Sequence, residues 1–290
     1  MYSLADENVL IGGQRIACAT VGSGEPVVLI HGTPSSSYIW RNVAPKLAAA
    51  GHKVHLFDLL GFGASEHPFD PAVDTSVSAQ VPILKGLMSQ WALERAHIVA
   101  HDIGGAVAQR FCLFHPTRVK TLTLIDTVSF DSWPSKRTKE QMKAGLETLI
   151  KTPDAEHRAH FREWLLSAVQ HKEAFASGPL ETFVDLISGP IGQASLFQHQ
   201  IAHYDHKYTS EISDRLAELS AMPVQILWGE NDAWQVVDWA HKLQAAIPGS
   251  VLRVLADCGH FAMEDQPERI SDLVISFIAD NRDRRLGGRL

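Results

Sequence analysis

Short apolar runs of strand length alternate with helix-compatible stretches in the first and last parts of this chain, and this alternation is the strongest constraint on its fold. The run 26–30 is continuously apolar and the others are mostly so, as expected for strands that are buried on both faces of a sheet. The runs lie at 26–30, 53–57, 96–100, 122–125, 224–228 and 251–255. Helical stretches accompany them at 38–50, 76–91, 105–115, 236–246 and 267–281. The alternation predicts an α/β protein with a parallel sheet and right-handed crossovers.

The alternation is interrupted between about residues 128 and 220. This segment contains no clear buried strand, is mostly helix-compatible and is rich in His, Trp and Phe. We therefore expect an α/β core formed by residues 1–127 and 221–290, with residues 128–220 inserted as a helical cap. The basic, glycine-containing tail from 282 to 290 is expected to be frayed.

Charge and composition exclude several classes of function. The 290 residues carry 26 Lys and Arg against 33 Asp and Glu, a formal net charge of −7, which is the opposite of a nucleic-acid binder. No apolar run reaches the roughly 18 residues that span a bilayer, and the first residues lack the pattern of a signal peptide. The cysteines, which form neither a CxxC pair nor a disulfide framework, are Cys18, Cys112 and Cys258. We expect a cytoplasmic protein without nucleic-acid or membrane partners.

The loop after the run 96–100 holds the first candidate for chemistry. Small residues, Ala100 and Gly104, stand two positions before and after Asp102, as in the sharp strand-to-helix turn of a nucleophile elbow. A carboxylate in the nucleophile position can attack an electrophilic carbon and form an ester. The following helix N-terminus would keep Asp102 ionised. A plain helix cap followed by a glycine turn is the structural alternative.

Three other loops at strand ends complete a possible site. Thr33 follows the run 26–30, and its backbone N–H together with that of Ile103 could form an oxyanion hole or bind a leaving group. Asp232 and His260 follow the last two runs, which gives the chain order nucleophile, acid, histidine. His260 would activate a water as general base and Asp232 would orient it. Each residue alone fits an ordinary loop, whereas four loops in this order favour catalysis.

These motifs together resemble the α/β-hydrolase superfamily, and within it the epoxide hydrolases and haloalkane dehalogenases that use an Asp nucleophile. The resemblance covers nearly the whole chain and rests on the segments 31–41, 58–65 and 101–104. It implies a mostly parallel central sheet flanked by helices, with a helical cap inserted after the sixth strand and no cofactor. Because some relatives place the acid after the strand ending near Ile125, Asp126 is a back-up acid.

The resemblance also bears on the bond that is attacked. Haloalkane dehalogenases place Trp directly after the nucleophile, and fluoroacetate dehalogenases place Arg there, whereas this chain has Ile103. Trp133 or Trp164 of the cap could hold a halide instead. Epoxide hydrolases use a cap Tyr, and sometimes His, to protonate the opening epoxide, a role that Tyr204 or His203 could fill. The resemblance thus favours hydrolysis of a small organic epoxide through an alkyl-enzyme ester.

Other functions stay open at this point. They are a haloalkane or haloacid dehalogenase, an esterase or lactonase, and, outside enzymes, a ligand sensor that retains the fold. A metal site among His199, His203 and His206 is weakly indicated because their spacing fits no common ligand motif, so we expect no metal. The expected partners are a small hydrophobic substrate and water, with the chain acting as a monomer or a homodimer.

Overall fold

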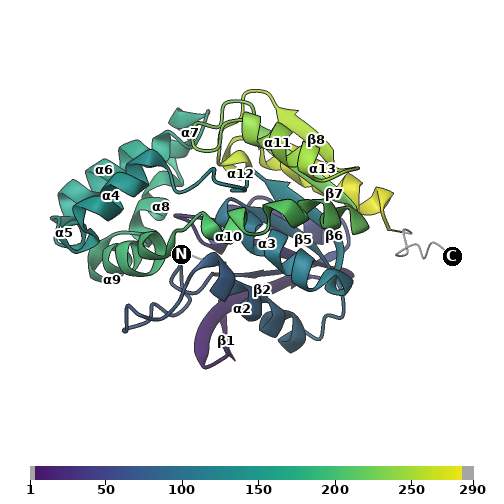
Figure 1. The fold of residues 1–290 in the computed structure, drawn as a ribbon, viewed down its shortest axis with the longest axis horizontal. Helices are drawn as coiled ribbons and strands as arrows, with labels where there is room; N and C mark the ends of the chain where they lie inside the picture. Colours follow the sequence, from purple (N-terminus) through teal and green to yellow (C-terminus); the bar gives the residue numbers. More distant parts are fainter. Residues whose placement is uncertain (1–3, 283–290) are drawn as a thin grey trace.

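The computed structural model describes residues 4–282, which form an eight-stranded sheet surrounded by helices (Figure 1). The strand order is β1-β2-β4-β3-β5-β6-β7-β8. The pairs β1–β2 and β2–β4 are antiparallel, and every other pair is parallel. The strands are β1 (Glu7–Ile11), β2 (Gln14–Gly22), β3 (Glu25–Ile30), β4 (His52–Phe57), β5 (Ala96–His101), β6 (Val119–Ile125), β7 (Val224–Gly229) and β8 (Val251–Leu255). The predicted mostly parallel α/β sheet is confirmed.

The burial of a strand determines whether its sequence predicts it. Strands β5 and β7 are buried at every position, so their sequences are continuously apolar or accept only hydrogen-bonded polar residues. The apolar runs do not predict β1, which is the edge strand and has no fully buried residue, or its neighbour β2, which is buried only in its middle. Their side chains are therefore mixed, and the signal of a buried strand is absent.

Helices cover both faces of the sheet. One face packs against α2 (Val77–Gln90), α3 (Ile103–Phe114) and α11 (Asp238–Ala246), and the other against α1 (Ala44–Ala49) and α13 (Pro267–Asp280). The short helix α12 (Ala262–Asp265) precedes α13. The single helix expected over 38–50 is wrong: a 3-10 turn (Ser37–Trp40) and α1 replace it. Pro45 lies in the first turn of α1, where proline starts a helix but cannot continue one.

The segment between β6 and β7 contains helices and turns but no strand within the described chain. Figure 1 shows α4, α5, α6, α8 and α9 gathered on one side of the molecule, beyond the sheet. A small apolar cluster of its own holds this cap together, made of Phe161, Ile187, Leu196, Phe197 and Ile201. The helices are α4 (Lys136–Ala144), α5 (Leu146–Ile150), α6 (Asp154–Leu166), α7 (Lys172–Ser177), α8 (Leu180–Leu186), α9 (Gly189–Ser195) and α10 (Lys207–Ser210).

The last part of the predicted insertion returns to the core. Arg110 of α3 donates to the Tyr208 carbonyl at 2.9 Å and pairs with the Glu211 carboxylate. The 3-10 stretch Ser213–Ala221 packs on the same helix and contributes Leu216 and Leu219 to the core cluster. The C-terminal end of the insertion is therefore packed on α3 of the core.

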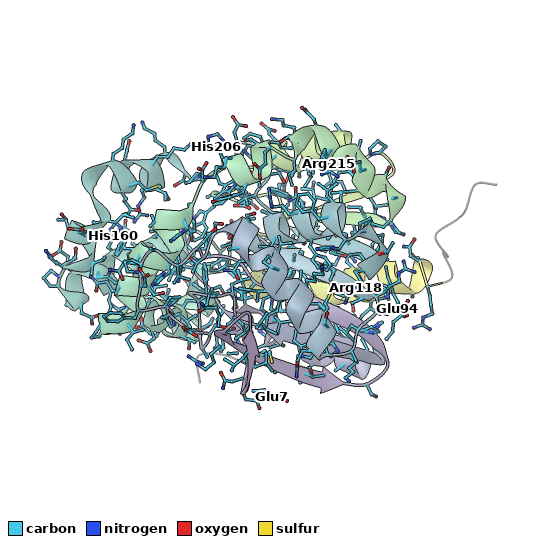
Figure 2. All side chains as sticks on the ribbon, turned by 60° about the horizontal axis from the view of Figure 1, so that its bottom comes forward. Glu7, Glu94, Arg118, His160, His206 and Arg215 are labelled. Carbon is cyan, nitrogen blue, oxygen red and sulfur yellow. The ribbon has the colours of Figure 1, made fainter. Side chains whose placement is uncertain are left out.

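Charged side chains of both signs lie around the outside of the molecule. Figure 2 shows Glu7, Glu94, Arg118 and Arg215 at its periphery. No helix among residues 4–282 is long and apolar enough to cross a membrane. The predicted frayed tail lies outside the described residues apart from Arg282.

Candidate active site

Asp102 lies at a sharp turn between β5 and α3. Its φ of 51° and ψ of −123° are unfavourable for a residue with a side chain, as is common where a functional group is held in place. The turn requires small neighbours: a Cβ added to Gly104 would lie 2.3 Å from the His31 carbonyl oxygen. The sequence pattern of an elbow thus coincides with the geometry of one, and the carboxylate points from the carboxyl edge of the sheet.

The two oxygens of the Asp102 carboxylate face different groups. Oδ1 accepts a hydrogen bond of 2.8 Å from the Thr33 backbone N–H. Oδ2 lies 3.6 Å from Nε2 of His260. Of the two predicted oxyanion donors, the Thr33 N–H makes the contact in the resting site, and Ile103 lines the cavity beside it. One oxygen is therefore fixed by the backbone while the other is directed toward the histidine.

Asp232 and His260 form a buried pair. Nδ1 of His260 lies 2.8 Å from Oδ2 of Asp232. The other Asp232 oxygen accepts hydrogen bonds from the backbone N–H groups of Trp234 and Gln235 at 2.7 and 2.8 Å. The carboxylate is thus held in a turn of its own loop, and it fixes the orientation of the imidazole.

The charges of this pair and of Asp102 reinforce one another. Burial lowers the pKa of His260, but the Asp232 and Asp102 carboxylates outweigh burial and raise it to about 10. Burial raises the pKa of Asp102, but the hydrogen bonding and charge of His260 bring it below its ordinary value. At neutral pH His260 is therefore an imidazolium, held between Asp102 and Asp232.

Asp126, the back-up acid, has a different environment. Its Oδ1 accepts a hydrogen bond of 2.8 Å from the Gly229 N–H. Burial, followed by the charge of Asp232, raises the pKa of Asp126 well above its ordinary value. The carboxylate that hydrogen bonds to His260 is Asp232, and Asp126 lies behind it.

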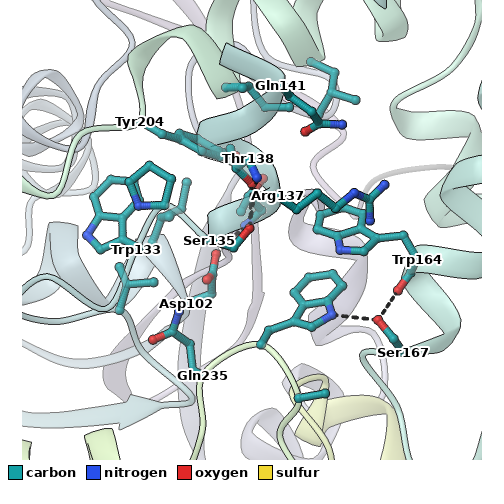
Figure 3. A pocket seen from close by; sticks show the side chains of 18 of the residues that line it. Asp102, Trp133, Ser135, Arg137, Thr138, Gln141, Trp164, Ser167, Tyr204 and Gln235 are labelled. Atoms are coloured by element: carbon teal, nitrogen blue, oxygen red, sulfur yellow. Dashed lines mark hydrogen bonds between the residues drawn. The ribbon is translucent and has the colours of Figure 1, made fainter. Parts of the chain in front are cut away.

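A cavity of about 260 Å³ opens above Asp102, near the lower end of the size range of small-molecule sites (Figure 3). Its lining comes from both core and cap and is largely apolar. The lining residues are Thr33, Asp102, Ile103, Val128, Trp133, Pro134, Ser135, Arg137, Thr138, Gln141, Phe161, Trp164, Ser167, Leu196, Ile201, Tyr204, Ala233, Trp234 and Gln235. Among the predicted cap residues, Tyr204, Trp133 and Trp164 lie here.

His203, predicted to contact substrate, does not line the cavity in this arrangement. Its Nδ1 lies 3.6 Å from the Asp74 carboxylate. It is the last residue of a 3-10 turn (Ile201–His203) whose first residue, Ile201, lines the cavity instead. The neighbouring Tyr204 is therefore the cap residue of this pair that reaches the site.

Tyr204 lines the cavity beside Thr33. Its hydroxyl is hydrogen bonded to the Thr33 side chain, and its ring packs edge to face on Trp133 with centroids 5.6 Å apart. Burial raises the pKa of Tyr204 above its ordinary value, so the phenol stays protonated. Thr33 thus contacts both Tyr204 and Asp102, one through its side chain and the other through its backbone.

The indole N–H groups of the cavity are mostly occupied. Trp133 donates to the Thr209 hydroxyl at 2.8 Å and Trp234 donates to the Ser167 hydroxyl at 2.9 Å. Trp164 stacks on Trp234 with centroids 4.2 Å apart and planes 9° apart. Of these three indoles, only the Trp164 N–H makes no hydrogen bond within residues 4–282.

Sequence reasoning missed several lining residues. Trp234 and Gln235 stand two and three positions after Asp232, so the acid loop itself was a signal that could have found them. Ser135, Arg137 and the next turn of α4 had no such signal, because only the folding of the cap brings them to the cavity.

The three cap histidines considered as metal ligands do not form a cluster. Nε2 of His199 lies 2.6 Å from the Pro68 carbonyl oxygen, and His206 is exposed at the periphery (Figure 2). Residues 4–282 contain no group of three or more His, Cys, Asp or Glu side chains placed to hold a metal ion.

Comparison with known proteins identifies the family. The sequence profile of the alpha/beta hydrolase fold matches residues 25–267, which is most of the chain. This chain belongs to the α/β-hydrolase family. An uncharacterized protein of Mycobacterium tuberculosis is 31% identical over 284 residues, covering 92% of this chain and 79% of that protein. The α/β-hydrolase part of the predicted resemblance is confirmed.

Named relatives of this hydrolase and solved structures extend the comparison. A protein of Cupriavidus pinatubonensis named 2-hydroxy-6-oxononadienedioate/2-hydroxy-6-oxononatrienedioate hydrolase is 28% identical, covering 92% of this chain and 91% of that protein. The structure of an α/β-hydrolase fold protein from Burkholderia ambifaria superposes with a TM-score of 0.83 at 30% identity, covering 94% and 97% of the two chains. An epoxide hydrolase structure has a TM-score of 0.74 at 24% identity and covers 94% and 98%, which shows a shared fold.

Proposed function

We propose that this hydrolase opens small organic epoxides, with Asp102 as the nucleophile and an alkyl-enzyme ester as intermediate. One observation carries the proposal: a single cavity contains the Asp102 carboxylate, which is hydrogen bonded to the Thr33 backbone, and the Tyr204 phenol, which is hydrogen bonded to the Thr33 side chain. The carboxylate is the nucleophile that epoxide opening needs, and the phenol is the acid that it needs.

The first step forms the ester. Oδ2 of Asp102 attacks an epoxide carbon and the bond from that carbon to the epoxide oxygen breaks. Tyr204 gives its proton to the departing oxygen, which becomes a hydroxyl on the same molecule. The Thr33 N–H keeps Oδ1 in place, so the attacking oxygen is oriented before the substrate arrives.

The second step cleaves the ester. Alkylation removes the negative charge of Asp102, so the pKa of His260 falls from about 10 and its proton can return to the Tyr204 phenolate. Neutral His260 then accepts a proton from a water that attacks Cγ of Asp102, and the Thr33 N–H stabilises the oxyanion. The intermediate releases the diol, with the proton on His260 passing to the leaving oxygen. The new Asp102 carboxyl then ionises and restores the imidazolium.

Dehalogenation is the second candidate, supported by the free indole N–H of Trp164. The position after the nucleophile supplies only the apolar side chain of Ile103, and the Trp133 N–H is occupied by Thr209. A halide would thus find one indole donor, whereas an epoxide oxygen finds a phenol. This difference supports the epoxide over the halide.

The names of the relatives suggest hydrolysis of a hydroxy-oxo-dienedioate, a dicarboxylate that contains a carbonyl carbon. Carboxylate attack on a carbonyl carbon would give an anhydride rather than an ester, which supports an alkyl electrophile for a chain with Asp at the elbow. The same argument applies to simple esters and lactones. A hydroxy-oxo-dienedioate and an aryl ester belong in the substrate panel for this reason.

The test is to trap the ester. In His260→Gln, attack by Asp102 should proceed while hydrolysis stalls, so incubation with an epoxide should add the substrate mass to the peptide that contains Asp102. Asp102→Ala should show no adduct. Wild-type enzyme is assayed in parallel with epoxides, haloalkanes, haloacids, an aryl ester and a hydroxy-oxo-dienedioate.

The products separate the candidates. A diol from epoxides with a trapped adduct supports the proposal, whereas halide release from haloalkanes alone supports dehalogenation. Turnover of the carbonyl substrates without an adduct on Asp102 would overturn the nucleophilic role. Ligand-induced thermal shifts without any turnover would instead indicate a sensor.

A further inference from the structure

The cavity has a positively charged end. Two of its lining residues carry a formal charge at neutral pH, Asp102 from the core and Arg137 from the cap. Figure 3 shows Asp102 and Gln235 on one side of the cavity, and Gln141 and the Arg137 guanidinium on another. The cavity is thus polarised, with an anion at its floor and a cation at its rim.

Arg137 has no acidic partner that would explain its position. Its guanidinium lies 5.3 Å from the ring centroid of Trp164 and donates to Nε2 of His160. Within residues 4–282, no carboxylate oxygen lies within 4.0 Å of it, although Glu163 acts on it from farther away. Two other cap arginines differ: Arg158 and Arg162 pair with carboxylates at 2.5 and 2.6 Å.

Nearby acidic groups offset only part of the loss of hydration that the Arg137 guanidinium suffers on burial. Burial lowers the pKa of Arg137 from its ordinary value, and the more distant Glu163 only partly opposes this effect. A half-buried guanidinium without a carboxylate has lost hydration without gaining a strong partner. A bound anion would supply that partner, and the planar guanidinium fork matches a carboxylate.

Polar side chains accompany Arg137 at the start of α4 and on its next turn. Ser135, Thr138 and Gln141 also line the cavity, whereas most of the remaining wall is apolar. The Ser135 and Thr138 hydroxyls lie 2.9 Å apart and are hydrogen bonded to each other. These groups can donate further hydrogen bonds to an oxyanion beside the guanidinium.

The charge at the floor sets the direction of binding. Asp102, whose pKa lies below its ordinary value, lines the floor of the cavity as an anion, whereas the protonated His260 does not line the cavity. An anionic group is therefore repelled from the floor and attracted to the rim. A substrate with a carboxylate would be held with its other end against Asp102.

We propose that Arg137, with the polar side chains of α4, forms a carboxylate-binding subsite, and that the natural substrate carries a carboxylate opposite its reactive carbon. The identity of that carbon as an epoxide carbon rests on the proposed function. The subsite itself does not, because it concerns binding at the other end of the cavity.

The test uses an unreactive probe pair on the full chain. Binding of 4-ethylbenzoate and of the neutral 4-ethylbenzamide is measured by calorimetry for wild type, Arg137→Met, Arg137→Lys and Lys136→Met. Lys136 is a matched control because it precedes Arg137 on α4, carries the same charge, is 92% exposed and does not line the cavity.

Wild type is expected to prefer the carboxylate, and Arg137→Met should weaken carboxylate binding by about 10- to 100-fold, the usual range for a hydrogen bond to a charged group. The amide should bind both proteins equally. Arg137→Lys should restore part of the preference, and Lys136→Met should retain all of it. An unchanged preference in Arg137→Met, or an equal loss in Lys136→Met, would overturn the subsite.

Turnover of two epoxides distinguishes failure of the subsite proposal from failure of the proposed function. With 4-(oxiran-2-yl)benzoate and 4-methylstyrene oxide, Arg137→Met should raise KM for the carboxylate epoxide alone. If the benzoate preference depends on Arg137 but neither epoxide gives a diol or an adduct on Asp102, the subsite stands and the epoxide hydrolase proposal fails. If both epoxides react and Arg137→Met affects them equally, the subsite fails and the proposed function stands.

Discussion

Replacing Tyr204 by Phe removes one hydroxyl from the cavity and tests the proposal that Tyr204 protonates an epoxide oxygen. The hydroxyl is hydrogen bonded to the Thr33 side chain, while the ring packs on Trp133 at 5.6 Å between centroids. Phenylalanine retains the ring and its packing. The substitution is therefore confined to the proton donor and its one hydrogen bond.

The expected effects on rate and on stability differ in size. General acid catalysis contributes about 10²- to 10⁴-fold, which is about 2.7 to 5.4 kcal/mol of activation free energy. Loss of one hydrogen bond lowers the free energy of unfolding by only about 1 kcal/mol. Alkylation of Asp102 by an epoxide should slow at least about 100-fold. Alkylation by a haloalkane should be nearly unchanged because a halide leaves without a proton.

The assay measures the rate at which the mass of the Asp102 peptide increases in a His260→Gln background. Tyr204→Phe is compared with Tyr208→Phe, whose ring lies outside the cavity. Urea unfolding reports stability for both. An unchanged epoxide rate in Tyr204→Phe, or equal slowing with epoxide and haloalkane, would refute Tyr204 as the acid.

Two further substitutions test the elbow and the buried pair. Gly32→Ala should lower the rate of Asp102 alkylation about 100-fold, because the added Cβ would lie 2.4 Å from Cβ of Asp102 and small displacements of reacting groups are costly. Gly178→Ala is the control and should leave the rate unchanged, because the atom nearest to its added Cβ lies 3.8 Å away. Asp232→Asn should lower the pKa of His260 from about 10, as followed by NMR. The folded-state pKa of His260 is raised, so its protonated form stabilises the folded wild-type protein. The free energy of unfolding of wild type should therefore exceed that of Asp232→Asn by most below about pH 6.5, and this difference should shrink as the pH rises to about 10. Equal differences in urea unfolding at about pH 6 and 10 would contradict this.

The parts of the fold that the sequence predicts are those with strong local signals. Buried strands read as apolar runs, and the loops that follow them carry Asp102, Asp232 and His260 because parallel strands end at one edge of the sheet. The interruption of this pattern predicts the helical segment between β6 and β7. These features depend on sequence neighbours or on a general rule of topology.

The parts that the sequence does not predict depend on tertiary contacts. Whether Trp133 offers its N–H to a ligand depends on Thr209, which is 76 positions away. Whether His203 or Tyr204 faces the cavity depends on one short turn in the cap. Arg137 has no recognisable motif and becomes notable only when folding leaves it beside the cavity without a carboxylate.

The most direct test of the account follows the oxygen of water through one turnover. Enzyme in excess over an epoxide substrate is allowed to react once in ¹⁸O-labelled water. If Asp102 forms an ester that water cleaves at Cγ, the label should enter the peptide that contains Asp102, and the first diol should carry none. Label in the first diol and none in the peptide would show direct attack by water and would contradict the nucleophilic role of Asp102.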